Sequence, residues 1–208
     1  MQWLQQHFQL IDNYPRPNWE AIYKHVETNC KDDNQHDLWC KIVKIWISRL
    51  TSKFADQYSV HESNNFMIVT TEGERYVSQY LSFLERTLIK ISKNLPGITS
   101  DEGYGKYVVL IFDDMDQYYS YLSYYMHGEG EFGQSSGIYI NDGYGHFAFP
   151  NQNLALAETI AAHEMTHALL AHLPIPHWLN EGMAMTMENG LTGSSPLIVD
   201  NEIISRHK

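Results

Sequence analysis

Two histidines four residues apart, His163 and His167, lie inside an apolar stretch with the pattern of a single helix. Asn151 or Asn153 can cap the start of this helix, and Pro174 ends it because proline cannot continue a helix. Four residues make slightly more than one helical turn, so the two imidazoles project from the same face. The segment therefore predicts a helix that carries two neighbouring histidines, a pair that can bind one metal ion.

The residue after the first histidine is Glu164, which completes the pattern His-Glu-x-x-His. Its side chain lies about 100° around the helix from His163, so the carboxylate flanks the two imidazoles. Neutral imidazole is a common zinc ligand, and a catalytic zinc site has three protein ligands and one position for water. We therefore expect His163 and His167 to bind zinc and Glu164 to act as general base for that water.

A second helix is expected from Pro176 or His177 to Gly190, and residues 178–184 in its first turns read Trp-Leu-Asn-Glu-Gly-Met-Ala. This sequence and the preceding His-Glu-x-x-His resemble the gluzincin branch of zinc metallopeptidases, within the peptidase MA-like superfamily. The resemblance implies that Glu181 is the third zinc ligand, with one zinc ion per chain. The geometry agrees, because the short connection turns the chain back and returns Glu181 toward the two histidines.

Other candidates for the third ligand fit the pattern less well. His172 lies about 140° around the helix from His167 and points elsewhere. His177 can lie near the site, but we expect it to be a residue of the helix start. Glu188 shares a face with Glu181 yet lies too far along the helix for the same ion, so we expect it to support a ligand or to face solvent.

The chain before these helices alternates between strand and helix patterns. Residues 66–70 are typical of a strand, residues 107–112 of a buried strand, and residues 74–94 of a helix. Residues 137–141 and 146–149 flank Asp-Gly-Tyr-Gly, which suits a hairpin. We therefore expect an α+β fold with a small mixed sheet, and the resemblance implies a thermolysin-like zincin domain.

The first third of the chain has mainly helical patterns. Asn18 can cap a helix over residues 19–28, and a longer amphipathic helix follows over residues 37–54. We expect an N-terminal helical module over residues 1–61, followed by the zincin-like metallopeptidase domain over residues 62–208.

Gluzincins usually stabilise the oxyanion with a His or Tyr from a following subdomain, and only a short segment follows the expected ligand here. Tyr139, Tyr144 and His146 on the hairpin are the candidates for this role or for contact with an extended substrate strand. Some gluzincins carry an acidic residue, which orients a zinc ligand, where this chain has Met185. The group that orients the ligand must then come from elsewhere.

The charge balance excludes some partners. With 14 Lys and Arg against 25 Asp and Glu, the net charge is −11, and no basic cluster favours nucleic acid or an anionic membrane. The longest apolar run, residues 108–112, is too short to span a bilayer. No secretory signal is visible, which predicts a cytoplasmic protein if Met1 is native and a secreted one if a leader was removed.

The pattern and the resemblance together predict a zinc-dependent endopeptidase that acts on peptide or protein substrates. An alternative is a metallopeptidase-like domain that binds a protein or peptide without cleaving it, with the N-terminal helices as its docking surface. A purely structural zinc fits less well, because a closed structural site uses four protein ligands and the sequence offers three.

Overall fold

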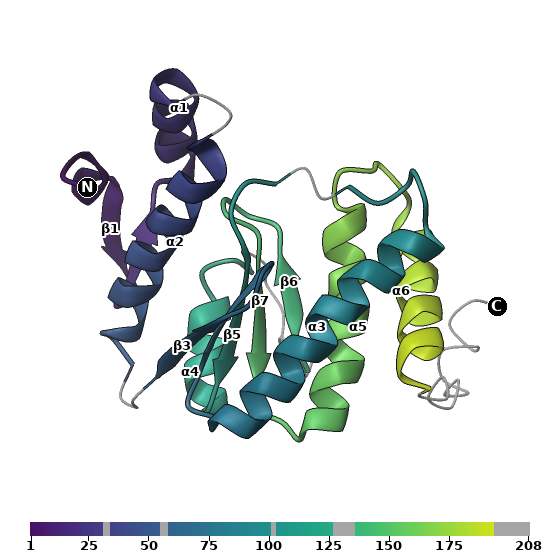
Figure 1. Cartoon of the computed structure of the whole chain (residues 1–208). Helices are drawn as coiled ribbons and strands as arrows, with labels where there is room; N and C mark the ends of the chain where they lie inside the picture. The colour runs from purple at the N-terminus through teal and green to yellow at the C-terminus, as the bar shows by residue number, and fades with distance from the viewer. Residues whose placement is uncertain (31–33, 55–57, 101–102, 127–135, 194–208) are drawn as a thin grey trace.

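The computed structural model describes residues 1–30, 34–54, 58–100, 103–126 and 136–193. These residues form six α-helices and a mixed sheet of five strands, so the fold is α+β as expected (Figure 1). A separate two-stranded hairpin lies near the N-terminus. Within the described ranges, every helix is too short or too polar to cross a membrane.

The five-stranded sheet has the order β3-β4-β5-β7-β6. The three central strands run parallel, and each edge strand is antiparallel to its neighbour. The central strands are buried along almost their whole length, as their continuous apolar character predicts for a sheet covered on both faces. The expected hairpin is present as β6 and β7. The strands are β3 (Ser59–Glu62), β4 (Phe66–Thr70), β5 (Tyr107–Phe112), β6 (Ile138–Ile140) and β7 (His146–Pro150).

The side chains of each central strand divide between two hydrophobic cores. In β4, Met67 and Val69 face one core while Phe66 and Ile68 face the other. This division follows from the pleat, because successive side chains of a strand point to opposite faces. The sheet therefore separates two hydrophobic cores, one on each of its faces.

Helices cover both faces of the sheet (Figure 1). Three of them lie together on the Phe66 face: α3 (Glu74–Asn94), α5 (Leu154–Leu170) and α6 (His177–Thr192). The Met67 face is covered by α1 (Trp19–Asn29), α2 (Gln35–Thr51) and α4 (Met115–Leu122). The core on the Met67 face is rich in aromatic side chains, among them Trp19, Trp39 and Trp46. Both layers thus form from amphipathic helices packed on one sheet.

The N-terminal region contains strands that the sequence analysis did not predict. A short 3-10 helix (Trp3–His7) leads into a hairpin of β1 (Phe8–Ile11) and β2 (Tyr14–Pro17). Its two-residue turn is Asp12-Asn13, and both residues have positive φ, at 49° and 67°. Such a turn favours Asn and Asp, so this pair was the signal in the sequence.

The expected division between residues 61 and 62 also differs from the structure. This position lies inside β3, which pairs with β4 in the main sheet. Moreover, Trp39 and Trp46 of the N-terminal region belong to the same core as Val69 and Val108 of the sheet. The described residues among the first 61 therefore share a core with the sheet and have no separate core of their own.

Candidate metal centre

Helix α5 holds the His-Glu-x-x-His sequence against the sheet. The Asn153 side chain caps it by accepting a hydrogen bond from the Leu156 N–H at 3.1 Å. Ala161, Met165 and Leu169 bury one side of the helix in the core. The two histidines lie on the opposite flank, where their side chains keep 20% and 15% of their accessible surface. The apolar side thus fixes the helix while leaving the imidazoles accessible.

Helix α6 packs on α5 after a short connection that contains two prolines. Its Ala184 is fully buried against the rest of the fold, and Gly193 ends the helix with a positive φ of 68°. The tight return places Glu181, in the second turn of α6, beside the two histidines of α5. Residues from two helices therefore meet at one position.

Three ligand atoms converge at this position. The Nε2 atoms of His163 and His167 are 3.1 Å apart. The carboxylate of Glu181 lies 3.5 Å from His163 Nε2 through Oε2 and 3.3 Å from His167 Nε2 through Oε1. These three residues form a cluster that can hold a metal ion, and it is the one such cluster among the described residues. The structure thus brings together the three residues that the sequence predicts as metal ligands.

Glu188 supports one of these histidines. Its Oε2 lies 3.0 Å from Nδ1 of His163, on the ring edge opposite the converging Nε2. In this arrangement the Nδ1–H donates to the carboxylate, which leaves the Nε2 lone pair for a metal ion. Glu188 therefore holds the His163 ring in place, which is the supporting one of the two positions considered for it. It supplies the acidic partner that is missing at Met185.

The other histidine is held by burial and by Asn180. Burial lowers the pKa of His167, while the Asn180 side chain and the charge of Glu181 partly offset this effect. His167 Nδ1 and Asn180 Oδ1 are both buried, and neither has a hydrogen-bond partner among the described residues. Asn180 and Glu181 are adjacent in the chain, so one turn of α6 places both residues beside His167.

Glu164 lies beside the cluster and is held by the edge strand. Its Oε2 accepts a hydrogen bond from the backbone N–H of Tyr139 at 2.7 Å. Burial raises the pKa of Glu164 to about 7, although this hydrogen bond and the charge of His163 oppose the shift. A carboxylate with such a pKa can both accept and release a proton near neutral pH.

An open cavity of about 480 Å³ contains the cluster and Glu164. Ile138 and Tyr139 of β6 form one wall together with Asn141, which follows the strand. Leu173 and Ile175 add apolar surface from the connection between α5 and α6. The site is therefore a polar cluster at the base of a cleft with partly apolar walls, a common form for sites that bind small molecules or peptides.

The hairpin residues considered for oxyanion or substrate contacts have different positions. Tyr139 lines the cavity, and its ring packs on Phe147 with centroids 5.1 Å apart. Tyr144 and His146 lie instead in the aromatic core on the other face of the sheet. Tyr144 donates to the Lys106 carbonyl at 2.6 Å, so the structure does not bring these two residues to the metal centre.

The remaining histidines considered as ligands lie outside the cluster. His172 is exposed at the end of α5. The side chain of His177 retains 87% of its accessible surface, with Nδ1 3.7 Å from Glu181 Oε1. The expectation that His177 is a residue of the helix start agrees with this position.

Comparisons of the chain with protein-family models, with curated proteins and with solved structures found no match.

Proposed function

We propose that this chain is a zinc-dependent metallopeptidase of the gluzincin type, acting as an endopeptidase on peptide or protein substrates. The α+β fold, with an edge strand beside the helix that carries His-Glu-x-x-His, supports a thermolysin-like zincin domain. The proposal assigns His163, His167 and Glu181 to zinc and Glu164 to proton transfer.

The distances between the three ligand atoms are the observation that carries the proposal. Ligands at about 2.0–2.1 Å from a tetrahedral zinc ion lie about 3.3 Å from one another. The separations in this structure are 3.1, 3.3 and 3.5 Å. Three protein ligands also leave one position for water, as catalytic zinc sites do. Both the donor set and its spacing therefore suit zinc.

Zinc bound at such a site lowers the pKa of water toward neutrality and polarises the carbonyl of a peptide bond. Glu164 accepts the proton from the attacking water and returns it to the leaving amine. Its raised pKa of about 7 suits both steps, because the carboxylate is then neither too weak as a base nor too weak as an acid. The Tyr139 N–H fixes the carboxylate while it carries out these transfers.

Strand β6 is the expected binding edge for an extended substrate. Ile138 and Ile140 face β7 across an antiparallel pair, and the Tyr139 N–H points outward to Glu164. The N–H and C=O of one residue point to the same side in an antiparallel ladder, so the Tyr139 carbonyl also faces the cleft. A peptide that pairs with this edge places its backbone along the cavity beside the three ligands.

Zinc content and proteolysis test the proposal together. Protein purified without chelator should contain one zinc per chain by elemental mass spectrometry, and it should cleave an unstructured protein. A chelator should abolish cleavage, and added zinc should restore it. Glu181→Ala should lose the metal, because a site with two ligands binds zinc too weakly.

Glu27→Ala, which changes an exposed carboxylate of α1, is the matched control and should retain zinc. A wild-type protein without zinc after reloading contradicts the proposal. Zinc binding together with peptide binding, but without cleavage, supports the alternative of a binding module.

A further inference from the structure

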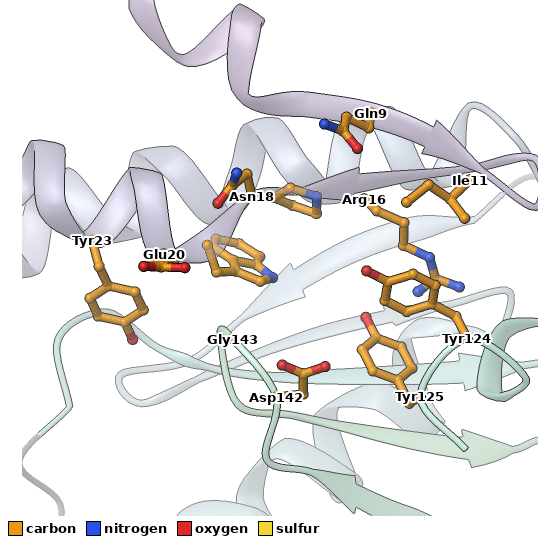
Figure 2. Close-up of a pocket in the computed structure, with 12 residues that line it drawn as sticks. Gln9, Ile11, Arg16, Asn18, Glu20, Tyr23, Tyr124, Tyr125, Asp142 and Gly143 are labelled. Atoms are coloured by element: carbon orange, nitrogen blue, oxygen red, sulfur yellow. The ribbon is translucent and has the colours of Figure 1, made fainter. Parts of the chain in front are cut away.

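Figure 2 shows a second cavity and the residues that line it. It lies on the Met67 face of the sheet, whereas the candidate metal centre lies on the Phe66 face. Its volume is about 450 Å³, within the range of small-molecule sites. Its walls come from the β1–β2 hairpin, the start of α1, the segment after α4 and the turn between β6 and β7. The proposed peptidase function does not use this cavity.

Arg16 of β2 is the unusual residue of this cavity. It retains only 4% of its accessible surface. Its Nη2 donates to the Tyr121 carbonyl at 3.0 Å, whereas its Nε is buried without a hydrogen-bond partner. Four tyrosine rings surround the guanidinium with centroids 4.3–5.1 Å from Cζ, those of Tyr14, Tyr121, Tyr124 and Tyr125.

The guanidinium has no counter-ion in the part of the chain that the structure describes, because none of the ion pairs there includes Arg16. A buried charge is costly unless it is paired, and contact with aromatic rings offsets only part of that cost. The group that best completes a guanidinium is a carboxylate, which accepts two parallel hydrogen bonds from it. The unpaired charge therefore favours a ligand with a carboxylate.

Two acidic residues, Asp142 and Glu20, line the same cavity. Burial raises the pKa of Tyr125. The charge of Arg16 lowers this pKa and the charge of Asp142 raises it, so both charges lie close enough to act on the Tyr125 hydroxyl. Asp142 and Arg16 nevertheless form no ion pair with each other, and Figure 2 shows their side chains directed into the region beside Tyr125. The carboxylates disfavour a multiply charged anion and favour a ligand that also has an ammonium group.

We propose that this cavity binds an aromatic α-amino acid, either free or as a short peptide, with the carboxylate on Arg16 and the ammonium on Asp142. Trp19 and Tyr23 line the same space and provide flat apolar surfaces for the side chain of such a ligand. The site is independent of zinc, and it lies on the other side of the sheet from the proposed peptidase centre.

Isothermal titration calorimetry with four probes tests this assignment. L-phenylalanine and the dipeptide Phe-Phe carry both charges, while 3-phenylpropionate lacks the ammonium and phenethylamine lacks the carboxylate. At least one of the first two should bind with a dissociation constant below about 1 mM. The two singly charged probes should bind about tenfold more weakly or worse, because each leaves one charged group of the cavity unpaired. The tighter of the two doubly charged probes identifies the source of the ligand.

Two variants distinguish this site from binding elsewhere. Asp142→Asn, in an exposed turn, should weaken binding of the better doubly charged probe about tenfold without weakening that of 3-phenylpropionate. Arg16→Met should weaken binding of the three probes that carry a carboxylate and leave binding of phenethylamine unaffected, with folding checked by circular dichroism. Glu27→Gln, which changes an exposed carboxylate outside the cavity, is the control and should bind all probes as the wild type does.

If neither doubly charged probe binds the wild type with a dissociation constant below about 1 mM, the proposal is overturned. It is also overturned if Asp142→Asn binds every probe with unchanged affinity. Because Asp142 is exposed, this second result does not depend on whether Arg16→Met folds.

Discussion

The two faces of the sheet use histidine in opposite ways. On the aromatic face, His146 is fully buried, with Nε2 2.7 Å from the Tyr121 hydroxyl and Nδ1 2.8 Å from the Tyr144 carbonyl. On the other face, His163 and His167 remain partly accessible, and their Nε2 atoms point at each other and at a carboxylate. Both ring nitrogens of His146 already have partners, whereas the Nε2 atoms of the other two converge on a single position.

This difference shows how to distinguish a structural histidine from a ligand. Burial lowers the pKa of His146 to about 4, so it stays neutral and acts as a fixed hydrogen-bonding group in the core. The pair on α5 sits at the edge of its core, where a metal ion and a substrate can reach it. A buried histidine with both ring nitrogens hydrogen-bonded has a structural role. Histidines whose accessible ring nitrogens converge on one position are candidate metal ligands.

The strongest test of this contrast is Glu164→Gln. Glutamine keeps the size of the side chain but cannot take a proton, so turnover should fall by roughly 10²–10⁴-fold. Zinc content should not change, because Glu164 is not among the three converging ligands. Peptide cleavage and elemental analysis of the same sample measure both quantities, and undiminished cleavage would remove Glu164 from the mechanism.

The pH dependence of stability tests the other face. His146 has a folded pKa of about 4, below its ordinary value of 6.5, so the unfolded chain binds a proton that the folded chain does not. Stability is therefore complete above pH 6.5 and falls as the pH drops toward 4. The expected loss between pH 7 and pH 5 is about 2 kcal/mol, and it approaches about 3 kcal/mol at pH 4.

Urea denaturation of the wild type and of His146→Gln at these pH values measures this loss. The variant should lack this part of the pH dependence while retaining the contributions of other groups. Equal pH dependence in the two proteins would show that His146 does not stay neutral in the core.

Glu188→Gln tests whether zinc affinity depends on a group that contacts His163 without being one of the three proposed ligands. The amide is a weaker partner than a carboxylate for His163 Nδ1–H, so zinc affinity should fall about 10- to 100-fold. Competition with a chelator of known affinity gives this ratio. Glu27→Gln, at an exposed position of α1, is the control, and an equal effect of both changes would argue against an orienting role of Glu188.

A pair of glycines gives the smallest expected effects. Gly143 has a φ of 67°, and a Cβ there would collide with the Trp19 ring, so Gly143→Ala should lower stability by about 2 kcal/mol. Gly190 lies in α6 with open space around it, so Gly190→Ala should raise stability by about 0.5–1 kcal/mol. Thermal unfolding compares the stability of the two variants. Unchanged stability of Gly143→Ala would show that the Trp19 ring can shift to accept the added methyl group.

Local patterns in the sequence determined much of the candidate metal centre on the Phe66 face of the sheet. The spacing of His163 and His167 places both on one side of any helix, whatever surrounds it. The central strands were predictable in the same way, because continuous apolar runs indicate strands buried on both faces. The Asp12-Asn13 pair also indicated a turn in the sequence. The strands that it joins are too short to show a clear strand pattern.

Contacts between distant segments were decided by the tertiary structure. The strand period of two places His146 and Phe147 on opposite faces, but the sequence does not say which face receives α5 and which receives α2. The contacts of Glu188 with His163 and of the Tyr139 N–H with Glu164 each join residues 25 positions apart. They depend on how α6 and β6 pack against α5, and a pattern within one segment cannot specify the position of another.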